Sequence, residues 1–278
     1  MTKNKRPKIG LALGSGGARG LAHIGVIKIL EKNGIPIDFI AGSSIGAMIG
    51  GFYAAGMTIE EIEEIASSTD WRKVFSTLFE PSFKKGLIGG EKVKTFIENY
   101  INGKSFEECK MPFAAVATDL KTGEVAVLKK GEMALAMRAS ISIPLIFRPV
   151  EIGGRTLADG GLSAPVPVEI VRNMGADIVI AVNLDKHYYD EQWSPGFYDI
   201  ANGSLGILRH HLAMLNAANA DIVIEINAGN ISWYRFTNGR EKVLIGEEAT
   251  QKILPRLKEL INQKDKHSLD KILDFLKI

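Results

Sequence analysis

Short apolar runs alternate along the chain with stretches in which apolar residues recur at the spacing of one helix face. The first run covers residues 8–13 and opens into a glycine-rich loop. Apolar residues then recur at every third position from Leu21 to Leu30, and Gly34 follows as a C-terminal stop signal. This segment predicts a strand, a loop and a helix.

The next segment repeats that order. Residues 39–41 predict a second strand, a turn of small residues follows, and a helix is expected over about 45–55. Thr58 and Glu61 have the spacing of a capping box at the start of a further helix. Residues 39–59 carry no charge, so a membrane-spanning helix is an alternative, but the five glycines in the run favour a buried segment.

Four later apolar runs predict further strands, at residues 113–117, 125–128, 178–182 and 222–226. Helices are expected near 205–218 and 247–262, and residues 185–204 predict an irregular loop, either a lid or a simple connection. Strands that alternate with helices indicate an α/β fold with a largely parallel sheet covered on both faces.

The alternation predicts one domain over residues 8–263, with a basic extension at residues 1–7 and an amphipathic helix at residues 264–278. One face of that helix would carry Leu269, Ile272, Leu273 and Leu276. Such a helix either packs onto the domain or a second subunit, or lies on a lipid surface. The sequence leaves the oligomeric state open.

Composition excludes several classes of protein. A hydrophobic content of 46% excludes disorder for most of the chain, and a net charge of only +2 argues against nucleic acid as a partner. The single cysteine, Cys109, cannot form an internal disulfide or a cysteine-rich metal site, and none of the histidines forms an H-E-x-x-H zinc motif. The basic start lacks an uninterrupted apolar stretch, so a cytoplasmic location is expected.

A candidate nucleophile lies between the second predicted strand and the helix that follows it. Residues 42–46 read Gly-Ser-Ser-Ile-Gly, which matches the G-x-S-x-G pattern with Ser44 at the nucleophile position. In that setting a sharp turn lifts the serine hydroxyl above the sheet, and side chains at positions 42 and 46 would crowd the turn. An ordinary turn of small residues is the alternative.

The glycine-rich loop, residues 14–20, suits an anionic intermediate better than a dinucleotide. Arg19 stands where the dinucleotide fingerprint needs its third glycine. A loop without bulky side chains can instead direct successive amide N–H groups toward one oxygen atom, as acyl transfer requires. Arg19 either holds the loop or meets an anionic head group, or else it faces solvent.

A serine nucleophile needs a base, and the histidines are poor candidates. His23 lies inside the first helix and is expected to be a hydrogen-bonded packing residue, and the other four have no recognisable setting: His187, His210, His211 and His267. Asp119, Asp159 and Asp185 come near the ends of apolar runs, where sites in α/β sheets gather. Asp159 alone is followed by two glycines, and the other two aspartates are expected in turns.

Three motifs together resemble, in order and spacing, the patatin-like phospholipases. These are residues 16–20, the segment around Ser44, and Asp159 with Gly160 and Gly161. Residues 138–144 and 118–120 are similar to further family segments. One departure is Ser15, where many members carry glycine.

The resemblance implies a three-layer α/β/α sandwich with a mainly parallel sheet and a two-step acyl transfer that needs no metal or cofactor. Ser44 would be the nucleophile and Asp159 a base with a raised pKa. The N–H groups of the oxyanion hole would come from Gly16, Gly17, Ala18 and Ile45. Supporting positions would be Arg19, Gly42, Gly46, Gly160 and Gly161.

The resemblance further implies an acyl lipid or lysolipid as substrate, with peripheral contact to a membrane. Two other functions stay open. One is an acyltransferase on the same scaffold, which passes the acyl group to an alcohol or thiol. The other is a lipid-binding or regulatory module without turnover, although the presence of both Ser44 and Asp159 argues against it.

Overall fold

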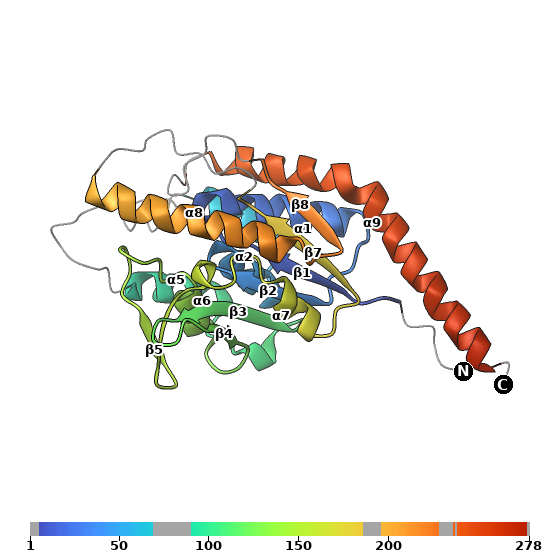
Figure 1. The fold of residues 1–278 in the computed structure, drawn as a ribbon, viewed down its shortest axis with the longest axis horizontal. Helices are drawn as coiled ribbons and strands as arrows, with labels where there is room; N and C mark the ends of the chain where they lie inside the picture. The colour runs from blue at the N-terminus through green and yellow to red at the C-terminus, as the bar shows by residue number, and fades with distance from the viewer. Residues whose placement is uncertain (1–5, 69–89, 186–195, 228–235, 237, 277–278) are drawn as a thin grey trace.

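The computed structural model describes residues 6–68, 90–185, 196–227, 236 and 238–276, with only the backbone of Tyr198 and of residues 266–276. One eight-stranded sheet forms its centre (Figure 1), in the order β5-β6-β3-β2-β1-β7-β8 with β4 paired to β3. The parallel strands are β1 (Ile9–Leu13), β2 (Phe39–Ser43), β3 (Phe113–Asp119), β7 (Ile178–Asn183) and β8 (Ile222–Glu225).

Helices cover both faces of this sheet. One face packs against α1 (Ala22–Lys32), α2 (Ile45–Ala54), α3 (Ile59–Ser67), α5 (Glu91–Ile101), α6 (Met133–Ser140) and α9 (Gly239–Leu276). The other packs against α7 (Val168–Asn173) and α8 (Phe197–Ala217). Successive residues of a strand point to opposite faces, so Leu11 and Leu13 enter the first core and Ala12 enters the second. The expected burial of residues 39–59 agrees with this arrangement.

The sheet is mixed rather than uniformly parallel. Three strands run antiparallel to their neighbours: β4 (Val125–Leu128), β5 (Val150–Ile152) and β6 (Arg155–Asp159). The β5–β6 connection consists of Gly153 and Gly154, both with positive φ, +58° and +76°. A two-residue turn of that kind can only join antiparallel strands, because a parallel pair needs a long crossover.

Two expectations about helices need correction. The loop expected over 185–204 is wrong from residue 197 onward, because α8 begins at Phe197 with Gly196 as its N-cap; residues 186–195 lie outside the described part. The helices expected at 247–262 and 264–278 are one helix, α9, which starts at Gly239 and continues through Pro255. It packs along α1 and then extends beyond the sheet (Figure 1).

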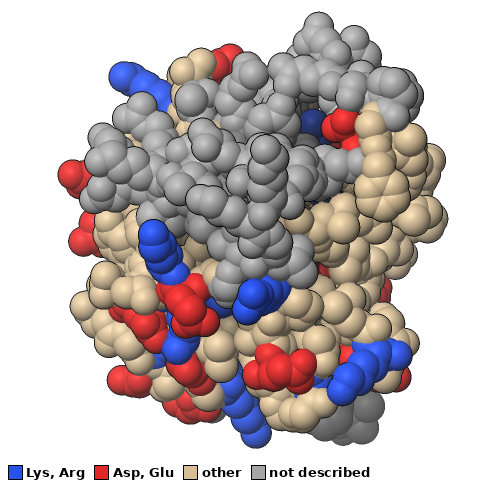
Figure 2. Space-filling model, turned by 90° about the vertical axis from the view of Figure 1, so that its left-hand side faces the viewer, with Lys and Arg blue, Asp and Glu red and all other residues tan. Residues whose placement is uncertain are grey.

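The capping box of α3 is confirmed, with the Glu61 N–H donating to Thr58 Oγ1 at 3.2 Å and the Thr58 N–H donating to Glu61 Oε2 at 2.7 Å. Among the described residues, no helix is long and apolar enough to cross a membrane. On the face shown in Figure 2, described basic side chains are interspersed with acidic ones.

Candidate active site

Two strands meet end to end at the centre of the sheet. β2 runs along β3 until Ser43 pairs with Val116, and β6 runs in the opposite direction until Asp159 pairs with Ala117. Because β4 occupies the other edge of β3, β2 and β6 lie along the same edge and approach each other head-on. The residues at their ends are therefore brought together although 115 positions separate them in sequence.

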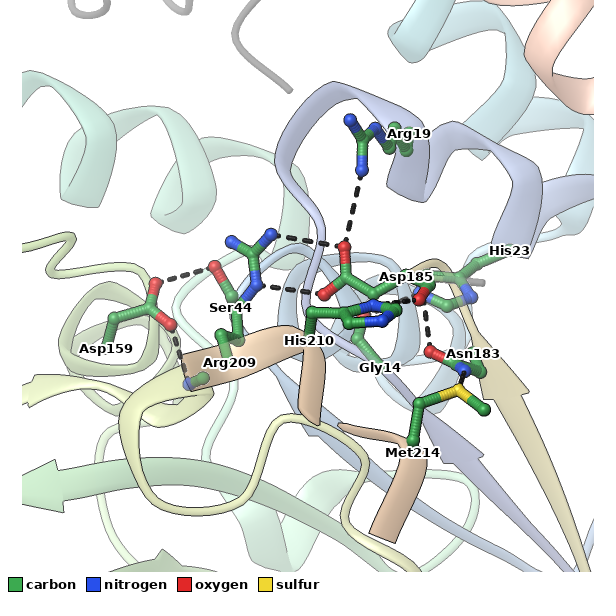
Figure 3. A network of polar contacts seen from close by, with 11 residues as sticks. Gly14, Arg19, His23, Ser44, Asp159, Asn183, Asp185, Arg209, His210 and Met214 are labelled. Carbon is green, nitrogen blue, oxygen red and sulfur yellow. Dashed lines mark hydrogen bonds and ion pairs between the residues drawn. The ribbon is translucent and has the colours of Figure 1, made fainter. Parts of the chain in front are cut away.

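Ser44 and Asp159 form a direct hydrogen bond at this junction (Figure 3). Ser44 Oγ donates to Asp159 Oδ2 at 2.6 Å, and the two residues are only 5% and 6% exposed. The distance is that of a charge-assisted O–H···O⁻ bond, which is shorter and stronger than a neutral one. The geometry thus joins a buried hydroxyl to a buried carboxylate with no histidine between them.

The turn at Ser44 depends on the small residues around it. Ser44 has φ +55° and ψ −123°, a backbone conformation that residues other than glycine rarely adopt. Helix α2 begins at the next residue. A Cβ at Gly42 would lie 2.3 Å from the Gly46 carbonyl oxygen, and one at Gly46 would lie 2.2 Å from that of Leu13. These contacts confirm the predicted steric need for glycine at positions 42 and 46.

Asp159 is held by the two glycines that follow it. The Gly161 N–H donates to Asp159 Oδ1 at 2.7 Å, and a Cβ at Gly160 would lie 2.2 Å from the Val116 carbonyl oxygen. Burial raises the pKa of Asp159 to about 6, against the lowering effects of its bonds to Ser44 and Gly161 and of the charge of Arg209. The expected direction of this shift is confirmed.

The glycine-rich loop lies beside Ser44 and the start of α2. Gly17 has φ +58°, a left-handed conformation that favours glycine. Between the described residues, no hydrogen bond engages the N–H of Gly16, Gly17 or Ile45, so these donors remain available. A Cβ at Gly20 would lie 2.2 Å from Ile45, so close packing fixes the loop against the start of α2.

Ser15, the departure from the usual glycine, is the residue of this loop that lies near Asp159. Its hydroxyl is buried and has no hydrogen-bond partner among the described residues. A Cβ on Gly161 would be 3.0 Å from Ser15 Oγ and 2.9 Å from Asp159 Oδ1. The hydroxyl therefore lies near the Asp159 carboxylate without bonding to it.

An ion-pair network around the buried Asp185 adjoins the Ser44–Asp159 pair (Figure 3). Asp185, just after β7, binds Arg209 of α8 through two contacts, Nε–Oδ2 at 2.9 Å and Nη2–Oδ1 at 3.1 Å, and Arg19 Nη1 at 3.3 Å. Arg19 thus holds the loop rather than facing solvent. Arg209 was not predicted and Asp185 was expected only in a turn, because no local pattern indicates an ion-pair partner on a distant helix.

The remaining candidate bases lie elsewhere. His23 Nε2 donates to the Gly14 carbonyl at 2.8 Å, and burial lowers the pKa of His23 to about 4, which confirms its packing role. His210 Nδ1 contacts the Asp185 carbonyl at 2.6 Å. Asp119 accepts from the Lys121 N–H in a turn, as expected. His187 and the side chain of His267 lie outside the described part.

The order of these features along the chain corresponds to a known family. Residues 11–172 match the model of the patatin-like phospholipases, and this match covers more than half of the chain. The chain belongs to the patatin-like phospholipase family. The matched segment includes the loop, Ser44 and Asp159 of this patatin-like chain.

Relatives with known sequences match nearly two thirds of the chain. An uncharacterised NTE family protein of Mycobacterium bovis is 42% identical over 180 residues, which cover 64% of the chain and 49% of that protein. Human patatin-like phospholipase domain-containing protein 6 is 33% identical over 183 residues, covering 63% of the chain and 13% of that protein. The patatin-like chain spans about half the length of the mycobacterial relative.

Solved structures confirm the fold. VipD from Legionella pneumophila superposes with a TM-score of 0.56 at 14% identity, over 91% of the chain and 67% of VipD. Human GIVD cytosolic phospholipase A2 superposes with a TM-score of 0.53 at 11% identity, over 97% of the chain and 60% of the human protein. The patatin-like chain therefore has the three-layer α/β/α architecture.

Proposed function

We propose that this protein hydrolyses acyl esters of lipids, as a phospholipase A, lysophospholipase or esterase, through a Ser44–Asp159 dyad. The observation that carries the proposal is the 2.6 Å hydrogen bond between the two buried side chains, at a serine in a strained strand-to-helix turn. Family membership supports a lipid substrate. Contact with a membrane surface follows from that substrate and belongs to the same proposal.

Acylation requires one proton to move from the hydroxyl to the carboxylate. As Ser44 Oγ bonds to the ester carbonyl carbon, its proton passes to Asp159 Oδ2 along the existing hydrogen bond. The negative charge on the carbonyl oxygen is bound by N–H groups of Gly16, Gly17, Ala18 and Ile45. The intermediate then collapses, the ester C–O bond breaks, and the departing alcohol takes the proton from Asp159.

Deacylation repeats these steps with water. Water attacks the acyl-enzyme carbonyl and gives a proton to Asp159, the Ser44 Oγ–carbon bond breaks, and Ser44 regains its proton as the fatty acid leaves. An aspartate can serve in this way near neutral pH because its pKa of about 6 leaves most of it ionised at pH 7.

Covalent labelling tests the nucleophile directly. The structure of human GIVD cytosolic phospholipase A2 was determined with methyl γ-linolenyl fluorophosphonate, and the same reagent suits this chain. We expect one label per chain, located by mass spectrometry on the peptide that contains Ser44. Folded protein that resists labelling would instead support the non-catalytic module. Product analysis with an added alcohol acceptor separates hydrolysis from acyl transfer, because a transferase forms the new ester.

The oxyanion hole can be tested with a pair of glycine variants. Gly17→Ala should lower kcat by about 10- to 100-fold, because alanine resists the left-handed conformation that directs the loop amides. Gly34→Ala is the matched control, since Gly34 has φ +66° and no heavy atom within 4 Å of an added Cβ. Both variants carry the same backbone cost, so equal kcat values in ester assays would contradict this role of the loop.

A further inference from the structure

The C-terminal end of α6 passes beside the dyad and contacts Ser44. The Ser44 N–H donates to Ser140 Oγ at 2.9 Å, and Ser140 Oγ donates to the Val116 carbonyl at 2.5 Å. Ser140 is completely buried. Its hydroxyl therefore ties the strained nucleophile turn to β3, at the residue where β2 ends its pairing.

The same segment contacts the other member of the dyad two residues later. The Asp159 N–H donates to the Ser142 carbonyl at 3.0 Å. One short segment, residues 138–142, thus bonds to the backbone of the nucleophile and to the backbone of the base. We call this segment the α6 bracket.

Arg138 fixes the shape of the α6 bracket from within the core. It is 2% exposed, and its Nη1 donates to Ser142 Oγ at 2.6 Å while its Nη2 donates to the Arg148 carbonyl at 3.1 Å. The guanidinium also lies 4.8 Å from the centre of the Phe147 ring. A planar group with two arms can hold both partners at once, which a lysine ammonium cannot.

We propose that the α6 bracket sets the alignment of the dyad, with Ser140 as the positioning residue of Ser44 and Arg138 as a positioning residue that acts through Ser142. This inference rests on the proposed Ser44–Asp159 mechanism and adds to it a source for the 2.6 Å alignment. Neither residue touches the substrate. Their effect is on the angle and distance at which Ser44 Oγ meets the carboxylate.

Energetics favour a positioning role. Ser44 has φ +55°, so its backbone relaxes toward common conformations unless neighbours hold it. Without the Ser140 hydroxyl, the buried Ser44 N–H and Val116 carbonyl both lose their partner, and the turn gains freedom to shift. A displacement of about 1 Å in a catalytic group can reduce turnover by about 100-fold.

The test compares two buried hydroxyls. Ser140→Ala should lower kcat by about 10- to 100-fold on a soluble short-chain ester and slow fluorophosphonate labelling to a similar degree, while KM stays within about threefold. Thr250→Val is the control: Thr250 Oγ1 is fully buried and donates to the Gly246 carbonyl at 2.7 Å in α9, away from the dyad. It should lower thermal stability and leave kcat unchanged.

Arg138→Lys gives an independent second variant, which decides the matter if Ser140→Ala does not fold. It keeps the positive charge and loses the two-armed contact, so kcat should fall with little change in KM. Wild-type kcat in a folded Ser140→Ala or Arg138→Lys protein would overturn the α6 bracket. An unlabelled, inactive wild-type protein would overturn the proposed function instead, so the two failures are distinguishable.

Discussion

Replacing Ser44 with alanine is expected to lower ester turnover by about 10⁴-fold or more and to abolish fluorophosphonate labelling. The hydroxyl is the only group of the dyad that can bond to the acyl carbon, so its loss removes the acyl-enzyme route altogether. The backbone bond to Ser140 does not involve the Ser44 side chain and persists in the variant. Folding should therefore be retained, which a thermal melt can verify.

Ser43→Ala provides the matched control for this experiment. The Ser43 hydroxyl is also fully buried, but it has no hydrogen-bond partner among the described residues. Its removal deletes a buried, unpaired polar group, so stability should be unchanged or higher and kcat should be close to that of the wild type. If Ser44→Ala kept substantial turnover, or if both variants lost it equally, the nucleophile assignment would be wrong.

The sequence was sufficient to predict features whose defining residues lie within a few positions of one another, such as the turn at Ser44 and the capping box of α3. The strand and helix around Ser44 were predictable because Gly42 and Gly46 lie within five residues of each other. A Cβ at Gly42 would clash with the nearby Gly46, whereas one at Gly46 would clash with Leu13 of β1, which is distant in sequence. The capping box at Thr58 and Glu61 was predictable for the same reason, since its two bonds join residues three positions apart.

Features that depend on distant partners were not predictable. Asp185 was expected in a turn because its partner, Arg209, lies on a helix whose start at Phe197 was also missed. The contacts of Ser140 with Ser44 and of Ser142 with Asp159 arise from a helix end that the tertiary fold brings beside β3. Periodicity indicates which face of an element is buried, and it does not indicate which buried groups meet.

The meeting of Ser44 and Asp159 is an intermediate case. The two glycines after Asp159 indicate that the backbone there passes close to another part of the chain. In the structure, Gly160 lies against the Val116 carbonyl of β3. What the pattern did not reveal was the antiparallel direction of β6, without which Asp159 would end at the opposite end of β3. The pair Gly153-Gly154 was the available signal in the sequence, because two glycines favour the positive-φ turns that join antiparallel strands.

Replacing Asp159 with asparagine is expected to lower kcat by about 10³-fold while preserving the geometry of the site. The amide oxygen can still accept from the Gly161 N–H, but the side chain can no longer take the proton of Ser44.

In the wild type, kcat/KM should rise with pH around 6 and level off above about 7, because the base works only when ionised and its pKa is about 6. Steady-state assays between pH 4.5 and 8.5 check both statements; a flat wild-type profile over that range would remove Asp159 as the base.

The same substitution should change how stability depends on pH. Burial raises the pKa of Asp159 from 3.8 in the unfolded reference to about 6, so the folded state holds this proton more tightly than the unfolded state. The resulting stabilisation is fully present below pH 3.8 and is lost as pH rises through 6, a total of about 3 kcal/mol. Asp159→Asn removes this loss. The difference in free energy of unfolding, variant minus wild type, should therefore be more positive at pH 8 than at pH 4. Denaturant titrations at the two pH values would contradict the buried-base assignment if the difference between the proteins stayed constant.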